Sequence, residues 1–117
     1  EVIINRAEGT PSLWNDPSLV NRLLPVLKRT VGDKQVVAVP PQMGGEDFAR
    51  YGRTDPPIAS MMLRLGTVDK AAYQRWLRGA EELPSLHSPF YHPDAADTID
   101  TGVQAMTAAA LALLSGT

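Results

Sequence analysis

His87 is the side chain in this sequence best suited to hold a metal ion. It lies in the segment Leu86-His87-Ser88-Pro89, where the proline restricts the backbone of the loop. A neutral imidazole on a loop that follows a hydrophobic element is a common ligand of zinc, manganese or cobalt. A single histidine can equally be a hydrogen-bonded surface or packing residue, and the residue pattern alone leaves both interpretations open.

His92 lies five residues further along the same loop and could supply a second ligand together with Asp94. The spacing of the two histidines is not a helical i, i+4 pair, and it matches neither a zinc finger nor a zinc ribbon. An exposed loop histidine is therefore the preferred interpretation of His92. A self-contained metal site built from His87, His92 and Asp94 is kept as a weaker hypothesis.

A second polar loop contains two consecutive glycines, Gly44 and Gly45, followed by Glu46 and Asp47. Glycines let the backbone approach a ligand closely, and the N–H groups at a helix start suit a carboxylate or a phosphate. Glu46 or Asp47 could instead act as an acid or base, or orient a ligating histidine. The simpler alternative is a glycine turn followed by acidic residues that cap a helix.

Composition and motifs exclude several classes of function. The chain has 117 residues, no cysteine and a formal net charge of −2. Without cysteine, this chain can hold neither disulfides, nor thiolate zinc sites, nor a cysteine nucleophile. The interspersed charges offer no basic patch for nucleic acid and no polybasic run for a membrane, and the longest apolar run, residues 108–114, is too short to span a bilayer. No glycine-rich nucleotide motif or serine nucleophile elbow is present.

Three short strands are predicted, over residues 1–6, 35–39 and 58–65, because these segments are rich in apolar residues and end at glycine or proline. The first strand begins at Glu1 without an initiator methionine, which leads us to expect the middle of a longer protein.

Helices are predicted between these strands. Asp16 followed by Pro17 is typical of a helix start, and Gly32 is expected to end this helix in a left-handed conformation, with Pro25 as a kink. A short helical segment is expected over residues 46–51, a second helix after Asp69, and a C-terminal helix from Asp97 or Thr98. The apolar faces are expected to be Val20, Leu23, Leu24, Leu27 and Val31, then Tyr73, Trp76, Leu77 and Ala80, then Ile99, Val103, Met106, Ala110 and Leu114.

These faces are interpreted as core, although two aromatic residues on one short helix, Tyr73 and Trp76, could also dock a partner. Strands that alternate with helices predict an α/β fold. Three short strands would leave exposed sheet edges, so we expect the sheet to belong to a larger one or the chain to self-associate through its strand edges.

The ordered set of motifs resembles a known family. The set comprises Met43-Gly44-Gly45-Glu46-Asp47-Phe48-Ala49, then Arg64-Leu65-Gly66, then Leu86-His87-Ser88-Pro89, then a helix with Gly102 near its start. It is similar to the C-terminal part of the catalytic domain of metal-dependent amidohydrolases of the hippurate hydrolase, N-acyl-amino-acid and auxin-conjugate hydrolase type, in the zinc carboxypeptidase and aminoacylase superfamily. By this resemblance, residues 1–10 are a remnant of the last strand of an inserted lid domain with its linker, and residues 11–117 are the C-terminal portion of the catalytic domain.

The resemblance implies a partial three-layer zinc-peptidase-like domain, a mixed sheet flanked by helices, with the upstream strands and the lid domain missing. It implies hydrolysis of the amide bond of N-acyl amino acids by a metal-bound water, whose pKa the metal lowers. His87 takes the position of a metal ligand, Gly44 and Gly45 are candidates to bind the substrate carboxylate, and Glu46 and Asp47 are supporting candidates. Two divalent ions per full-length subunit are implied, zinc or else manganese, cobalt or nickel.

This chain lacks the family's upstream half, which carries a cysteine, further histidines, a glutamate ligand and the general-base glutamate. No catalytic residue is therefore assigned here, and the chain alone is expected to be inactive. The parent is expected to be a homodimer in the cytoplasm, acting on a small molecule without nucleic acid or membrane, although export is left open. The alternative is a stand-alone α/β binding module without catalysis, whose strand edges and Trp76 helix recruit a partner.

Overall fold

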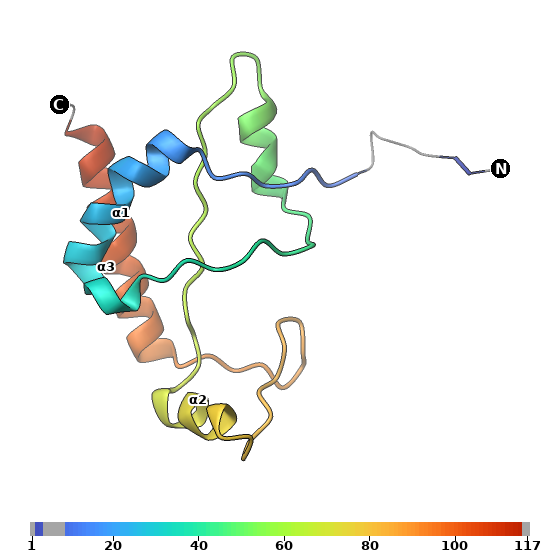
Figure 1. The fold of residues 1–117 in the computed structure, drawn as a ribbon, viewed down its shortest axis with the longest axis vertical. Helices are drawn as coiled ribbons and strands as arrows, with labels where there is room; N and C mark the ends of the chain where they lie inside the picture. Colours follow the sequence, from blue (N-terminus) through green and yellow to red (C-terminus); the bar gives the residue numbers. More distant parts are fainter. Residues whose placement is uncertain (1, 4–8, 116–117) are drawn as a thin grey trace. The chain divides into compact units, whose positions relative to one another are not determined.

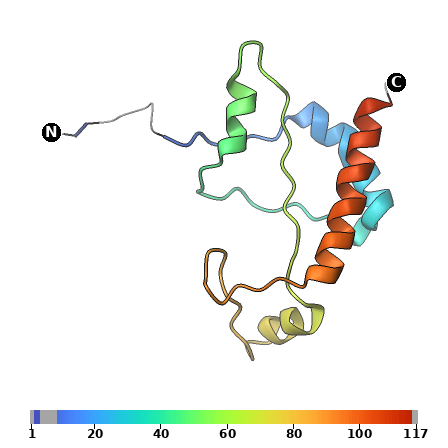
Figure 2. The ribbon, with the colours of Figure 1, turned by 180° about the vertical axis from the view of Figure 1, so that it is seen from behind.

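The computed structural model describes residues 2–3 and 9–115 of the chain (Figures 1 and 2). These residues form three α-helices, α1 (Pro17–Val31), α2 (Lys70–Leu77) and α3 (Ala95–Leu114), together with two 3-10 helices, η1 (Asp33–Gln35) and η2 (Asp47–Arg53). The chain divides into two compact units between Leu63 and Arg64. The first unit contains α1, η1 and η2, and the second contains α2 and α3.

The predicted α/β fold is wrong, because residues 2–3 and 9–115 contain helices and no strand. Residues 36–39 and 58–65 run as single extended stretches of chain (Figure 1). A strand requires a ladder of hydrogen bonds to a second strand, and neither segment has such a neighbour among the described residues. The first predicted strand, residues 1–6, lies mostly outside the described residues. The strand edges through which we expected self-association are therefore absent from the part of the chain that is described.

The start of α1 confirms the predicted helix cap. The Asp16 carboxylate accepts a hydrogen bond from the Leu19 N–H at 2.9 Å, and Pro17 is the first helical residue. The Ser18 hydroxyl also donates to this carboxylate, at 2.5 Å. The hydrogen bond from Ser18, followed by that from the Leu19 N–H, lowers the pKa of the Asp16 carboxyl below its ordinary value of 3.8.

The apolar face predicted for α1 is also confirmed, because Leu23 and Leu27 are buried. The helix continues through Pro25 and ends before Gly32, whose N–H donates to the Lys28 carbonyl at 3.0 Å. Gly32 has a positive φ of 100°, which favours glycine, but its ψ of 137° is extended rather than left-handed helical. The predicted position of the helix end is therefore correct, and its predicted conformation is not.

Two residues before α1 bind the extended segment that was predicted as the third strand. The Asn15 side chain accepts from the Met62 N–H at 2.9 Å and donates to the Met62 carbonyl at 3.1 Å. The Asp16 N–H donates to the Ser60 carbonyl at 2.8 Å. A side-chain amide thus supplies the hydrogen bonds that a neighbouring strand would otherwise supply. This contact joins the entry of α1 to the end of the first unit.

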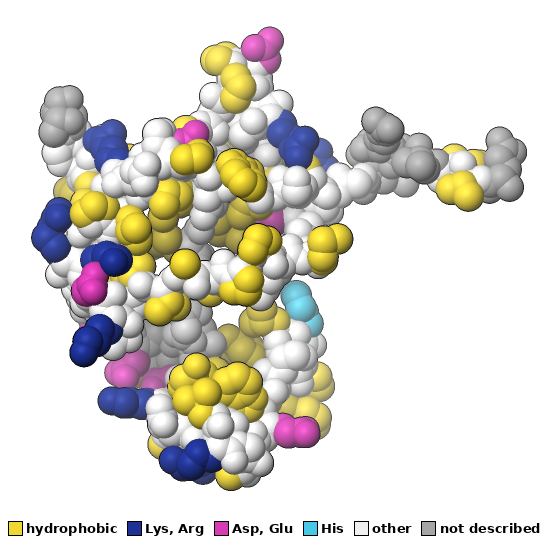
Figure 3. All heavy atoms as spheres, in the orientation of Figure 1, with side chains coloured by type: hydrophobic (Ala, Val, Ile, Leu, Met, Phe, Trp, Pro, Cys, Tyr) yellow, Lys and Arg dark blue, Asp and Glu magenta, His cyan; other side chains and the backbone are white. Residues whose placement is uncertain are grey.

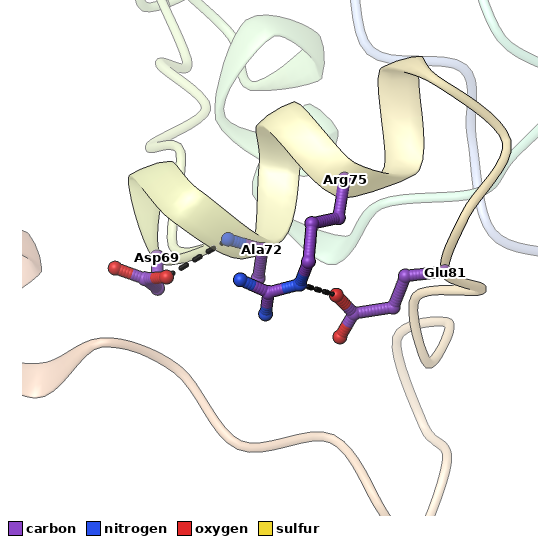
Figure 4. Close-up of polar contacts among 4 residues, drawn as sticks. All are labelled: Asp69, Ala72, Arg75 and Glu81. Carbon is purple, nitrogen blue, oxygen red and sulfur yellow. Dashed lines mark hydrogen bonds and ion pairs between the residues drawn. The ribbon is translucent and has the colours of Figure 1, made fainter.

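The start of α2 confirms the cap predicted at Asp69, whose carboxylate accepts from the Ala72 N–H at 2.9 Å (Figure 4). Arg75 forms an ion pair with Glu81 at 2.6 Å just after the helix (Figure 4). The Tyr73 and Trp76 rings stack with centroids 5.5 Å apart. None of the residues of α2 is buried, so its predicted core face is exposed, and hydrophobic side chains gather over this helix in Figure 3.

The third helix begins earlier than predicted. It starts at Ala95, with Asp94 at the cap position, rather than after Asp97 or Thr98. The Asp94 side chain makes no capping hydrogen bond, but its N–H donates to the Thr67 carbonyl at 2.8 Å. This hydrogen bond joins Asp94 to a residue far away in the sequence, so the local pattern could not indicate it.

The apolar face predicted for α3 is wrong. Its buried residues are Ala105 and Ala109, whereas every member of the predicted face is exposed. Gly102 lies on the same side as the buried alanines, and a Cβ atom placed on it would lie 3.1 Å from a methyl carbon of Leu65. Small residues permit this close approach, which larger side chains would prevent. No helix among the described residues is long and apolar enough to cross a membrane.

Candidate functional site

Gly44 and Gly45 form a loop in the first unit, which we call the glycine loop. They line a hollow of about 350 Å³, together with Thr10, Ser12, Gln42 and Met43. The Gly44 N–H donates to the Gln42 carbonyl at 3.1 Å. The Gly45 N–H makes no hydrogen bond to any described residue. Of the two glycines predicted to bind a carboxylate, Gly45 is therefore the one whose N–H can donate to a ligand without giving up an internal bond.

Gly45 also packs closely against Thr10. A Cβ atom at position 45 would lie 2.6 Å from the Thr10 Cβ, which is too close for any side chain, so this contact requires glycine. Arg50 donates to the Gly9 carbonyl at 3.3 Å, and Arg53 donates to the Ser12 carbonyl at 3.4 Å. Residues 9–12 are thus held against η2, and Thr10 and Ser12 line one side of the hollow.

Glu46 and Asp47 stand at the start of η2. The Glu46 carboxylate accepts from the Phe48 N–H at 3.3 Å, and Asp47 is the first residue of the 3-10 helix. This is the geometry of the simpler alternative, in which acidic residues cap a helix. A role of either carboxylate in supporting the site stays a prediction.

His87 lies in the second unit, at the centre of a tight turn. Its φ is 70°, and it is the one non-glycine residue with a positive φ in the described part of the chain. The Ser88 N–H donates to the Ser85 carbonyl at 3.1 Å, and the Tyr91 N–H donates to the Ser88 carbonyl at 3.0 Å. These bonds hold the backbone on both sides of His87, and its exposed imidazole makes no hydrogen bond to any described residue.

Contacts further along the chain anchor the loop that carries His87. The Tyr91 and Thr67 hydroxyls form a hydrogen bond with each other, next to the bond between the Asp94 N–H and the Thr67 carbonyl. His92, between these anchors, is exposed. The loop is therefore tied to the segment that precedes α2, and His87 is at its tip.

The residues that the structure describes do not form a complete metal site. No three histidine, aspartate or glutamate side chains among them come together as a cluster that could hold an ion. His87, His92 and Asp94 accordingly do not make the self-contained site that we considered. His87 can contribute one imidazole nitrogen, whereas a protein metal site usually takes three or four ligands. Any metal role of His87 therefore needs donors other than those of the described residues.

Two features of the glycine loop were not predicted from the sequence: its contact with Thr10, and the hydrogen bonds from Arg50 and Arg53 to Gly9 and Ser12. Thr10 was placed in the predicted remnant of the lid domain and its linker, residues 1–10, and was not connected with the glycine loop. Arg50 and Arg53 lie three residues apart on η2, a spacing that puts them on one face of a helix, and this was the available signal. Their partners lie 41 residues earlier in the chain and could not be identified from the spacing.

Comparison with known proteins gives one partial similarity. Over 44 residues the chain is 48% identical to a protein of Bacillus subtilis (strain 168) that carries the name "Putative amidohydrolase YhaA". This alignment covers 38% of the chain and 11% of YhaA. No protein-family profile matches the chain, and no solved structure matches it. The chain is thus similar, over part of its length, to a protein named as an amidohydrolase, which supports the expected resemblance at that level.

Proposed function

We propose that this chain acts as part of a longer, metal-dependent hydrolase that cleaves the amide bond of N-acyl amino acids. The observation that carries the proposal is the 48% identity over 44 residues to YhaA. The order of the motifs around Gly44, Gly45 and His87 supports it. In this reaction, water adds to the amide carbonyl and the C–N bond breaks, which yields a carboxylate and a free amino acid.

In this proposal His87 is one metal ligand, and the other ligands come from outside the described residues. Its imidazole is exposed, makes no hydrogen bond to a described residue and stands on a backbone held by two hydrogen bonds. A ligand whose backbone is fixed loses little conformational entropy when it binds an ion. Zinc, or else manganese, cobalt or nickel, suits an imidazole ligand.

The glycine loop would bind the carboxylate of the amino-acid half of the substrate. The Gly45 N–H is the proposed donor, because the Gly44 N–H already donates to the Gln42 carbonyl. The hydroxyls of Thr10 and Ser12 line the same hollow and could add hydrogen bonds. Glu46 and Asp47 would support the loop through the start of η2.

The test of this function uses the full-length parent protein and hippurate as the substrate. Loss of a group that hydrogen-bonds to a metal ligand commonly costs about 10- to 100-fold in activity, so loss of a ligand itself should cost more than about 100-fold. We expect that decrease in kcat/KM for His87→Ala. His92→Ala, which removes a histidine from the same loop, is the matched control and should be nearly as active as the wild type. Near-normal activity of His87→Ala would contradict the proposal.

A titration of the 117-residue chain with zinc and manganese by calorimetry tests directly whether the ligands of the proposed metal site are divided between this chain and the rest of the parent protein. We expect negligible binding, because the described residues supply no cluster of ligands. Tight one-to-one binding that disappears in His87→Ala would show a complete site in this chain and would contradict the proposed division.

Protein binding through α2 is the second candidate function. The stacked Tyr73 and Trp76 rings are both substantially exposed, and aromatic residues of this kind are enriched at the centres of interfaces. If α2 serves only binding, Trp76→Ala in the parent protein should leave hippurate hydrolysis unchanged. If His87→Ala also leaves hydrolysis unchanged, binding becomes the preferred function.

A further inference from the structure

Two arginines of η2 hold the segment of residues 9–12, which we call the strap. Arg50 donates to the Gly9 carbonyl at 3.3 Å. Arg53 donates through one nitrogen to the Ser12 carbonyl at 3.4 Å and to the Ser12 hydroxyl at 3.3 Å. Both views of the ribbon show the strap beside η2 (Figures 1 and 2). The strap is therefore fastened at both of its ends to a single 3-10 helix.

The partners of these arginines are not those that the spacing along η2 favours. Asp47 is three residues before Arg50, and residues at this spacing lie on the same side of a 3-10 helix. Neither Arg50 nor Arg53 nevertheless forms an ion pair with a described residue. Both arginines donate instead to the strap, 41 residues earlier in the chain. The strap is thus the specific partner of both side chains within the first unit.

The hollow beside the strap contains two hydrogen-bond donors that the described residues leave unused. One is the Gly45 N–H, on the glycine that packs against Thr10. The other is the Ser12 hydroxyl, which accepts from Arg53 and donates to no described residue. A hydroxyl that accepts a hydrogen bond keeps its own hydrogen to donate. Ser12 and Gly45 line the same hollow, so a ligand there meets one donor from the backbone and one from a side chain.

We infer that Arg53 is a positioning residue, which directs the Ser12 hydroxyl toward the carboxylate of the substrate, while the Gly45 N–H donates to the same carboxylate. A carboxylate has two oxygens and accepts from both donors. The hydrogen bond from the charged guanidinium occupies a lone pair of the hydroxyl and polarises it, which strengthens the bond that the hydroxyl donates. The inference rests on the part of the proposed function that places the carboxylate at the glycine loop, and it assigns Arg53 a role in that binding.

Titration of the isotope-labelled 117-residue chain with hippurate, followed by NMR at the Gly45 amide, tests this inference without turnover. We expect a saturable shift with hippurate and none with hippuramide, in which a neutral amide replaces the carboxylate. Loss of the bond from a charged donor should weaken hippurate binding about tenfold in Arg53→Ala. Arg29→Ala is the matched control, because it removes the same charge from an exposed position on α1, and it should bind like the wild type. A Gly45 amide that does not respond to hippurate, or equal binding by the two variants, would overturn the inference.

A double-mutant cycle in the same titration separates positioning from a general structural role. If Arg53 acts through the Ser12 hydroxyl, Arg53→Ala should weaken binding strongly in the wild-type background and only slightly in Ser12→Ala. Arg53→Lys, which keeps a charged donor, should restore most of the affinity. Circular dichroism checks that the variants keep their helices. Equal effects of Arg53→Ala in both backgrounds would overturn the inference.

The outcome is distinguishable from a failure of the proposed hydrolase function. Normal hydrolysis of hippurate by the His87→Ala parent would contradict that function, and it would leave the response of the Gly45 amide to hippurate unchanged.

Discussion

The helices α1 and α3 distribute large and small side chains in opposite ways. The first buries leucines, Leu23 and Leu27, and the third buries alanines, Ala105 and Ala109. The large residues of α3, such as Ile99 and Met106, are exposed instead. A helix can thus pack through its small residues where a neighbouring segment must come close, while its larger apolar residues stay exposed.

The largest effect should come from the buried leucines of α1. Leu27 is 3% exposed, so Leu27→Ala removes buried methyl groups and leaves a cavity, which should lower the free energy of unfolding by about 2–5 kcal/mol. Leu114→Ala, at an α3 residue that is 82% exposed, should change it by no more than about 0.5 kcal/mol. Urea denaturation followed by circular dichroism measures both values. Equal effects of the two substitutions on the free energy of unfolding would contradict the claim that α1 buries its leucines and α3 exposes them.

The converse change should destabilise α3. Ala109→Leu forces a larger side chain into a buried position, and overpacking of this kind costs about 1–3 kcal/mol. Ala110→Leu makes the same substitution at the next residue, which is exposed, and should have little effect on stability. The same urea experiment applies. If Ala109→Leu is as stable as the wild type, the close packing of this side of α3 is disproved.

The hydrogen bonds between Asn15 and Met62 should contribute less than the buried leucines. Asn15→Ala leaves the Met62 N–H and carbonyl without these partners, which should cost about 1–2 kcal/mol of unfolding free energy. Asn15→Asp keeps the acceptor for the Met62 N–H and loses only the donor, so its cost should be smaller. Thermal unfolding ranks the stabilities of the wild type, Asn15→Asp and Asn15→Ala. An Asn15→Ala chain as stable as the wild type would contradict the contact with Met62.

The smallest expected effect is on how Tm depends on pH, which should differ between substitutions at the start of α1 and at the start of α3. The pKa of the Asp16 carboxyl is lowered, because Ser18 and the Leu19 N–H donate to its ionised form. The stability that this carboxylate contributes is present above the ordinary value of 3.8 and is lost as the pH falls through its lower value in the folded chain. The decrease in Tm between pH 6 and pH 3 should therefore be smaller in Asp16→Asn than in the wild type.

Asp94→Asn is the control for this pH experiment, because the Asp94 side chain makes no capping hydrogen bond at the start of α3. Its change in Tm over the same pH range should equal that of the wild type. If Asp16→Asn and Asp94→Asn give the same pH dependence, Asp16 does not stabilise α1 through its ionised form.

The candidate site was predictable only where its structure is local. A helical segment after the glycine loop and the capping role of Glu46 follow from residues that are neighbours in sequence. The turn around His87 likewise involves bonds between residues three apart. The contact between Thr10 and Gly45 spans 35 positions, and neither residue signals the other in the sequence. The roles of His87 and the glycines in chemistry remain predictions, which the experiments on the parent protein address.

The sequence by itself determined the starts of α1 and α2 and the end of α1. Asp16 and Asp69 accept hydrogen bonds from N–H groups three residues further on, and Gly32 follows the last residue of α1, so each signal acts within about one turn. Only the tertiary structure decided that residues 58–65 bind Asn15 and Asp16 rather than a neighbouring strand, and that α3 buries its alanines. Both outcomes depend on partners far away in the chain, and an apolar pattern shows that a residue can be buried without showing what will cover it.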